Sequence, residues 1–233
     1  MGFMNSQHIS TNNITLGFIC SSGGSVLDTC WPLFKELGIS IVIITDRECG
    51  VESKFKGRDG CIVERITYVD KTYFSSKCRD FFLQHKVNGF IGLYFTRFVG
   101  EEIYKNWNVV NFHPTLLPLF PGLGSKKKLI DSGSKMVGAT AHLVDGTCDG
   151  GAIIAQISNA SQVHHWDKML YLQKVYLLLA VLEKQLNSDL QATDSTDASD
   201  TYMNAYPRLC MKQVASFLND IQKNEKINFL AEA

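Results

Sequence analysis

The stretch Val109-Val110-Asn111-Phe112-His113-Pro114-Thr115-Leu116-Leu117-Pro118 joins a buried strand to two polar side chains at its end. The valines predict a strand inside the protein, and strand alternation places Asn111 and His113 on the same side. Pro114 and Pro118 end the strand, because proline lacks the N–H that a sheet needs. An amide and an imidazole so placed can stabilise an oxyanion and carry a proton. The alternative interpretation is a core histidine and asparagine that cap a loop.

Apolar runs and helical patterns alternate along the chain around this stretch. Strands are expected at residues 14–20, 39–44, 62–68, 89–94, 109–113, 136–144 and 151–157, and helices at 26–37, 71–85 and 169–186. The run 39–44 is mostly β-branched, which is typical of a parallel strand buried on both faces. This order predicts an α/β fold with a Rossmann-like, mostly parallel sheet and helices on both faces. Reactive residues are then expected at the carboxyl ends of the strands.

The composition divides the chain into a large domain and a smaller C-terminal part. Residues 1–186 are interpreted as a catalytic domain. Residues 187–205 are polar and poor in large apolar side chains, which predicts a mobile linker. Residues 206–233 are expected to form a C-terminal helical tail, with a helix over 206–222 that packs Leu209, Val214, Phe217, Leu218 and Ile221 onto the domain.

Charge and cysteine content exclude several classes of function. Lys and Arg total 23, as do Asp and Glu, so the net charge of zero argues against a nucleic-acid partner. The seven cysteines are scattered without a C-x-x-C pair, which indicates no zinc site and reduced thiols in a cytoplasmic protein. No apolar run is long enough to span a membrane, and the polar N-terminus lacks a signal core. His164 and His165 are expected at a helix start, with too few neighbouring ligands for a metal.

Three blocks of the sequence resemble the glycinamide ribonucleotide formyltransferase family. They are residues 111–123, residues 138–144 and Asp149-Gly150-Gly151-Ala152-Ile153-Ile154. Their order and spacing are similar to the family pattern, and a weaker likeness extends from about residue 14 to about residue 186. The resemblance implies a Rossmann-like sheet and formyl transfer from 10-formyltetrahydrofolate to a small-molecule primary amine, with Asn111, His113 and Asp149 as the catalytic residues.

These three residues fit the chemistry that the resemblance implies. Attack of an amine on a formyl carbon makes a tetrahedral species with a negative oxygen, to which His113 and Asn111 can donate hydrogen bonds. Asp149 can favour the charged form of His113 and carry a proton. Considered alone, Asp149 is a turn residue in Asp-Gly-Gly. His142 is by default a core histidine, and the resemblance gives it a supporting role near the cleft.

The resemblance also implies where the folate binds. One wall of its pocket is Phe95, Arg97, Phe98 and Val99, and the opposite wall is Gly146, Thr147 and Cys148. Ordinary core packing is the alternative for the three apolar residues of the first wall. Arg97 at the end of an apolar strand has to be paired or exposed.

The expected acceptor site departs from the family pattern. The loop that would hold a phosphate at a helix N-terminus consists here of Ser22, Gly23, Gly24 and Ser25, where the family has S-G-N-G-S-N. Lys174 stands near the place of a family glutamate that holds ribose hydroxyls, and a lysine cannot accept hydrogen bonds. The run Lys126-Lys128 is interpreted either as a site for phosphate or the folate glutamate tail, or as a solvated turn.

Three functions remain open at this point. The first is glycinamide ribonucleotide formylation in purine synthesis, and the second is N-formylation of a nucleotide-linked amino sugar. The third is a folate-binding relative without activity. Nothing supports tRNA as the acceptor, because no basic surface or second domain for it is evident. The oligomeric state is open, with a homodimer among the options.

Overall fold

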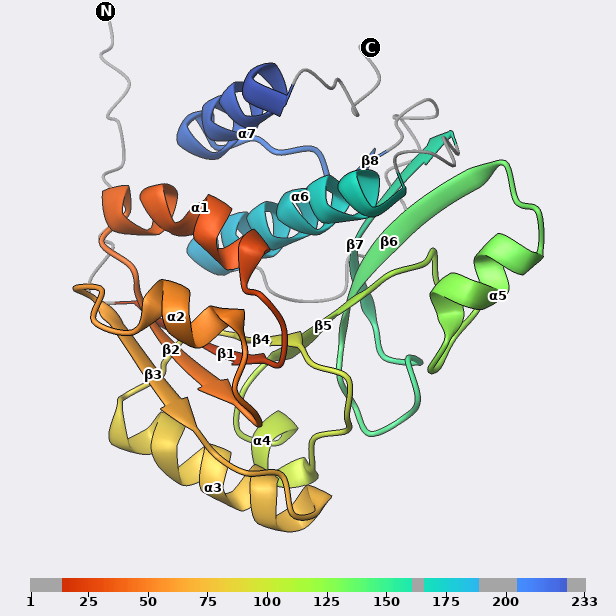
Figure 1. Ribbon diagram of the computed structural model, residues 1–233. Helices are drawn as coiled ribbons and strands as arrows, with labels where there is room; N and C mark the ends of the chain where they lie inside the picture. Colours follow the sequence, from red (N-terminus) through yellow and green to blue (C-terminus); the bar gives the residue numbers. More distant parts are fainter. Residues whose placement is uncertain (1–13, 161–165, 189–204, 226–233) are drawn as a thin grey trace, which may run out of the picture.

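The computed structural model describes residues 14–160, 166–188 and 205–225, which form one sheet covered by helices (Figure 1). The strands are β1 (Thr15–Cys20), β2 (Ser40–Thr45), β3 (Cys61–Arg65), β4 (Ile91–Tyr94), β5 (Val109–His113), β6 (Met136–Leu143), β7 (Ile153–Ala160) and β8 (Ala205–Tyr206). The helices are α1 (Ser25–Glu36), α2 (Gly50–Phe55), α3 (Lys71–Gln84), α4 (Glu101–Tyr104), α5 (Ser125–Asp131), α6 (Trp166–Leu186) and α7 (Lys212–Glu225).

The sheet of the described chain has eight strands in the order β3-β2-β1-β4-β5-β6-β7-β8. The strands from β3 to β5 run parallel, and β6, β7 and β8 continue the sheet in antiparallel pairs. The predicted α/β fold with a mostly parallel sheet is therefore confirmed. The strand order reverses between β1 and β4, and ligands of open α/β sheets usually bind in the crevice at such a point.

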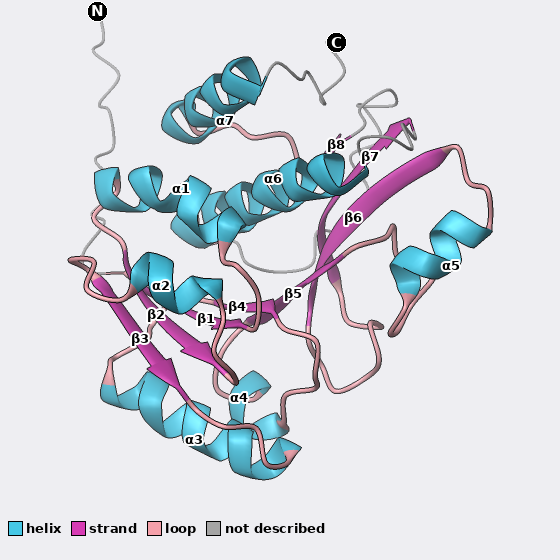
Figure 2. Ribbon diagram, viewed as in Figure 1, coloured by secondary structure: helices cyan, strands magenta, loops and turns pink. Residues whose placement is uncertain are grey.

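Helices cover both faces of the sheet, as Figure 2 shows for α1, α6 and α7 on one side and α3 and α4 on the other. The residues of β1 and β2 alternate between two apolar clusters. Phe18 and Ile43 pack in the cluster that contains α1 and α6, whereas Ile19 and Ile44 pack in the cluster that contains α3. Burial on both faces explains why these strands are almost continuously apolar.

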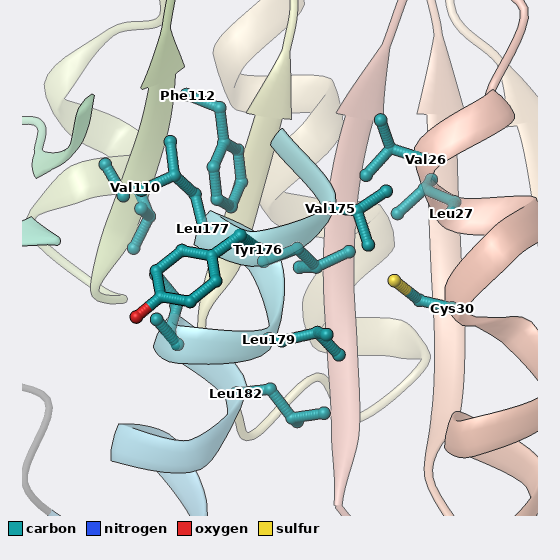
Figure 3. Close-up of a cluster of buried hydrophobic side chains, with 14 of the residues drawn as sticks. Val26, Leu27, Cys30, Val110, Phe112, Val175, Tyr176, Leu177, Leu179 and Leu182 are labelled. Carbon is teal, nitrogen blue, oxygen red and sulfur yellow. The ribbon is translucent and has the colours of Figure 1, made fainter. Parts of the chain in front are cut away.

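Helix α6 is apolar around most of its circumference because it packs against several elements at once. It contacts β6, β7, α1 and α7. Figure 3 shows its side chains Tyr176 and Leu177 near Val110 and Phe112 of β5. These side chains are all buried, and complete burial of a large apolar side chain contributes about 1.5–3 kcal/mol. This packing fixes the rotation of α6, and with it the direction in which its polar residues point.

Some elements differ from the sequence predictions. Helix α7 begins at Lys212, six residues later than expected, because Ala205–Tyr206 pairs with β7 as an edge strand. The five apolar residues expected on this helix segment do pack against the main core. Residues 126–128 lie in helix α5 and not in a turn. His164, His165, residues 189–204 of the expected linker and residues 226–233 of the expected tail lie outside the described residues.

The strand ends position the candidate site. β1, β4 and β5 are neighbours in the sheet and end in the same direction, so residues that follow them in sequence come together at one edge. Within the described ranges, no helix is both long and apolar enough to cross a bilayer.

Candidate active site

A cavity of about 420 Å³ opens at the carboxyl ends of β1, β4 and β5. Its lining includes all of the residues predicted for catalysis, for support of catalysis and for folate binding, namely Asn111, His113, Asp149, His142, Phe95, Arg97, Phe98, Val99, Gly146, Thr147 and Cys148. A second cavity of about 290 Å³ adjoins the loop before α1 and contains Gly23, Gly24 and Ser25 in its lining. Ser22 and Lys174 line both cavities. The structure thus brings every predicted site residue to one of two neighbouring cavities.

Asn111, His113 and Asp149 form one hydrogen-bonded set. His113 Nδ1 lies 3.2 Å from Asp149 Oδ2, and Asn111 Nδ2 donates to Asp149 Oδ1 at 3.3 Å. The Gly122 N–H also donates to Asp149 Oδ2, at 2.7 Å. His113 Nε2 lies 3.2 Å from the Phe120 carbonyl oxygen, so both ring nitrogens of His113 face acceptors. This arrangement accommodates an imidazole that carries a proton on each nitrogen.

The loop that carries Asp149 is held in place by local geometry. Asp149 has φ 53°, in the left-handed region that Asp and Asn tolerate better than most residues. Two residues later, a Cβ on Gly151 would lie 1.8 Å from the Leu143 carbonyl oxygen, so only glycine fits there. The turn role of Asp-Gly-Gly and the position of the Asp149 carboxylate beside His113 are therefore two aspects of the same structure.

His142 contacts the Asn111 amide. The two residues face each other across β5 and β6, and Asn111 Nδ2 lies 3.2 Å from His142 Nε2. His142 Nδ1 lies 2.9 Å from the Leu143 carbonyl oxygen, which can only accept. Burial lowers the pKa of His142, so the neutral ring donates through Nδ1 and accepts through Nε2. As a result, one proton of the Asn111 amide faces His142 Nε2 and the other faces Asp149 Oδ1, so both are hydrogen-bonded within the site.

The first wall of the larger cavity combines stacked rings with an ion pair. Phe95 stacks on Phe74 with ring centroids 5.3 Å apart. Phe98 is 58% exposed and Val99 only 7%, so core packing describes Val99 but not Phe98.

Arg97 was expected to be paired or exposed, and it is both. Its guanidinium lies over the Tyr68 ring, 4.5 Å from the centroid. Its Nε lies 3.5 Å from Asp46 Oδ2, a carboxylate at the end of β2 that is almost fully buried. The arginine side chain remains partly exposed on the cavity wall.

The opposite wall is a turn that includes Gly146, Thr147 and Cys148, all of them exposed. Asp145 accepts hydrogen bonds from the Thr147 backbone N–H at 2.9 Å and from the Thr147 hydroxyl at 2.6 Å. These bonds fix the turn and lower the pKa of the Asp145 carboxyl. Asp145 therefore shapes the wall without lining the cavity.

The loop before α1 has the geometry of a helix N-terminus with close backbone packing. Gly24 has φ 65°, and a Cβ there would lie 2.7 Å from Val51 Cγ2. No side chain caps the helix, so the first N–H groups of α1 are available beside the smaller cavity. Such N–H groups and the helix dipole favour an anion.

The three lysines of α5 are largely engaged in the protein itself. Lys126 pairs with Asp167, and Lys127 pairs with Asp131 at 2.6 Å. Lys128 Nζ lies 3.3 Å from the Pro121 carbonyl oxygen. These contacts favour the interpretation as a solvated, charged segment.

Sequence reasoning missed some residues that line the larger cavity. Tyr94 directly precedes the predicted folate wall, and it is the last residue of β4, a central parallel strand. Lys71 and Tyr104 also line the cavity. Lys71 lies on α3 and Tyr104 on α4, which cover the face of the sheet opposite to α6. No spacing in the sequence could therefore have placed these two residues at the cavity. Among the described residues, no group of three His, Cys, Asp or Glu side chains could hold a metal ion.

Comparisons with known proteins identify the family and agree with the fold. The sequence pattern described as formyl transferase matches residues 39–172, more than half of the chain. The trifunctional purine biosynthetic protein adenosine-3 of Gallus gallus is 28% identical over 156 residues, which cover 64% of this chain and 16% of that protein. Phosphoribosylglycinamide formyltransferase of Bacillus subtilis is 32% identical over 95 residues, 40% of this chain and 49% of that protein.

Solved structures show the same fold. Glycinamide ribonucleotide transformylase 1 from Geobacillus kaustophilus superposes with a TM-score of 0.66 at 21% identity, and covers 74% of this chain and 98% of its own. The enzyme of the same name from Symbiobacterium toebii superposes with a TM-score of 0.64 at 23% identity. The match covers 76% of this chain and 88% of that chain. The chain matches about a sixth of the Gallus gallus protein and about half of the Bacillus subtilis protein. From the matched pattern and the shared fold, the chain belongs to the formyl transferase family of enzymes.

Proposed function

We propose that this protein transfers the formyl group of 10-formyltetrahydrofolate to a primary amine in the larger cavity. The observation that carries the proposal is the hydrogen-bonded set of Asn111, His113 and Asp149 on the wall of that cavity. An amide, an imidazole and a carboxylate supply the donors and the proton carrier that acyl transfer needs. The complete set also argues against a relative that only binds folate.

Proton transfer in the proposed reaction follows from the contacts of His113 and Asp149. The amine attacks the formyl carbon, a carbon–nitrogen bond forms, and the carbonyl oxygen becomes negative. His113 Nε2 faces the Phe120 carbonyl oxygen in this structure. In the proposed step, the Nε2–H group donates a hydrogen bond to the negative oxygen of the tetrahedral species instead. Asp149 accepts the proton of the new ammonium and returns it to the departing folate nitrogen as the second carbon–nitrogen bond breaks. No covalent enzyme intermediate is required.

Asn111 contributes through an amide that is already oriented. Its Nδ2 lies 3.2 Å from His142 Nε2 and 3.3 Å from Asp149 Oδ1. An incoming oxyanion replaces the contact to Asp149 while His142 keeps the other proton. His142 is therefore proposed as a positioning residue, which corresponds to the supporting role expected for it.

The walls of the larger cavity suit a flat heteroaromatic ring. Phe95 and Phe98 on one side supply apolar surface, and the turn at residues 146–148 on the other side exposes backbone groups. The volume of about 420 Å³ falls in the range of small-molecule sites, roughly 300–1,000 Å³. The pterin of the folate is proposed to bind between these walls.

Glycinamide ribonucleotide is the first candidate acceptor. The Bacillus subtilis relative and the superposed structures carry names that specify this substrate. The free N–H groups at the start of α1, next to Gly24 and Ser25, offer a place for its phosphate.

A nucleotide-linked amino sugar is the second candidate, and Lys174 favours it. The lysine supplies a positive charge between the two cavities, where a diphosphate close to the sugar amine would bind.

Product mass after incubation with 10-formyltetrahydrofolate and each amine tests the proposal. A product heavier by one carbonyl group identifies the acceptor. Transfer to neither amine by the folded protein would remove both candidates, and an Asn111→Ala enzyme that stays fully active would remove the assigned site.

A further inference from the structure

Three residues from three elements line both cavities, and we call them the neck. They are Ser22, which follows β1, Tyr94 at the end of β4, and Lys174 on α6. An acceptor that reaches from the loop before α1 to Asn111 and His113 has to pass them. The chemistry of the neck therefore selects what the middle of the acceptor can be.

The amine of Lys174 has no hydrogen-bond or ion-pair partner among the described residues. Its burial lowers the pKa of the amine. Cys20 and Lys126 act electrostatically on this amine, and Tyr94, Tyr171 and Asp167 line the smaller cavity with it. The carboxylate of Asp167 already pairs with Lys126. Lys174 is half-buried, so its ammonium is partly withdrawn from water, and a bound anion would supply a counter-charge.

Tyr94 presents a second unpartnered polar group at the same place. Its ring stacks on Phe112, with centroids 4.8 Å apart and planes 5° apart, and also on Phe18 at 6.5 Å. The hydroxyl oxygen is fully buried and has no hydrogen-bond partner within the described part of the chain. Burial raises the pKa of the phenol, so the hydroxyl keeps its proton and can donate it. Buried polar groups are nearly always satisfied, so an orphaned donor that lines a cavity points to a ligand.

We propose that the neck binds an anionic group of the acceptor, a phosphate or a carboxylate, between Lys174 Nζ, Tyr94 Oη and the Ser22 hydroxyl. The proposal rests on the proposed function, because it names the class of acceptor for the same site. All three groups can donate hydrogen bonds, and the lysine supplies the charge. The acceptor is then an amine whose anionic group lies next to the reacting part. A neutral sugar at this position could not donate hydrogen bonds from its hydroxyls to Lys174, because an ammonium group only donates.

Protection of Lys174 from reductive methylation tests the neck without any substrate. The protein is methylated in increasing inorganic phosphate, acetate or chloride at matched ionic strength, and each lysine is quantified by mass spectrometry. We expect phosphate or acetate to protect Lys174, and chloride to have no such effect. Protection by one of the two identifies a phosphate or a carboxylate as the preferred group. Lys168 on the same helix pairs with Glu225, and its labelling should not respond.

Tyr94→Phe serves as the second arm of this experiment, because it removes only the hydroxyl and keeps the stacked ring. It should raise the anion concentration needed for half-protection of Lys174 about three- to tenfold. Labelling of Lys174 that ignores both anions, or that responds equally to chloride, overturns the proposal.

Kinetics with the formylated acceptor provide an independent measurement. Lys174→Met should raise KM for the acceptor about tenfold or more, with KM for the folate unchanged. Lys168→Met, the same substitution on the same helix outside both cavities, should leave both constants unchanged. An unchanged acceptor KM in a folded, active Lys174→Met enzyme refutes the neck but not formyl transfer. If the unmodified protein formylates no amine, the proposed function fails, while the protection experiment still decides the neck.

Discussion

Replacement of Asp149 by asparagine removes one negative charge from the proposed site and changes little else. Asparagine has nearly the same shape and tolerates the left-handed backbone that residue 149 adopts, with φ 53°. The carboxylate now accepts from the Gly122 N–H at 2.7 Å and from Asn111 Nδ2 at 3.3 Å, and it lies 3.2 Å from His113 Nδ1. An amide in its place has one oxygen for these three donors and adds a fourth donor among them.

The size of the effect follows from the ion pair with His113. At 3.2 Å and an effective dielectric constant of about 20, the attraction between Asp149 and a charged His113 is roughly 5 kcal/mol. The amide oxygen recovers part of this interaction. A loss of about 3–4 kcal/mol from the transition state remains, which lowers kcat by two to three orders of magnitude.

Steady-state kinetics measure this effect, with circular dichroism to confirm that Asp149→Asn is folded. Asp131→Asn is the matched control, because its carboxylate is exposed on α5 and pairs only with Lys127 among the described residues. The control should keep kcat within about twofold. A folded Asp149→Asn enzyme with kcat close to that of the control would contradict the role of the carboxylate in proton transfer.

Three further predictions concern stability and folate binding. Burial holds the pKa of folded His142 below its usual 6.5, so the unfolded chain binds the extra proton as pH falls below that value. Stability present above about pH 6.5 is therefore lost on acidification, and urea titrations should show a smaller loss for His142→Gln. Gly24→Ala should lower the free energy of unfolding by about 1–3 kcal/mol more than Gly38→Ala, because both positions have positive φ but only the first Cβ meets Val51; equal losses would contradict this clash. Arg97→Lys should raise KM for the folate about tenfold with little change in kcat, since a lysine cannot stack as a planar guanidinium does.

Much of the fold could be predicted because its signals are local. The β-branched run in β2 and the alternation of Asn111 and His113 in β5 both follow from strand geometry, and the structure has these strands within about two residues of the expected bounds. Helices α2 and α4 have six and four residues, too few for a helical period to appear in the sequence. Strand β8 has only two residues and depends on its pairing with β7.

The site was predictable only in part, because some of its relations depend on tertiary structure. The link between His142 and Asn111 needs the register of two antiparallel strands, which no spacing in the sequence specifies. The Tyr94 ring is packed between rings that come from β1 and β5, two strands separated from it in sequence. Asp149 could be placed beside His113 only through the family resemblance, since thirty-five residues, including α5 and β6, lie between them in the chain.

The way the site is built separates the proposed chemistry from the proposed acceptor recognition. Asn111, His113 and Asp149 hold one another through bonds that also involve the Gly122 backbone and His142, so a change in any one of them disturbs the others. The neck is different, because Lys174 and the Tyr94 hydroxyl have no bonds to these residues.

Lys174 is carried by α6, whose neighbouring residues Leu172, Val175 and Tyr176 pack in the core. A substitution at the neck can therefore alter which amine binds without displacing the groups that transfer the formyl group. For the same reason, an Asp149→Asn enzyme that has lost turnover should still show the preference of the neck for an anion in a binding measurement.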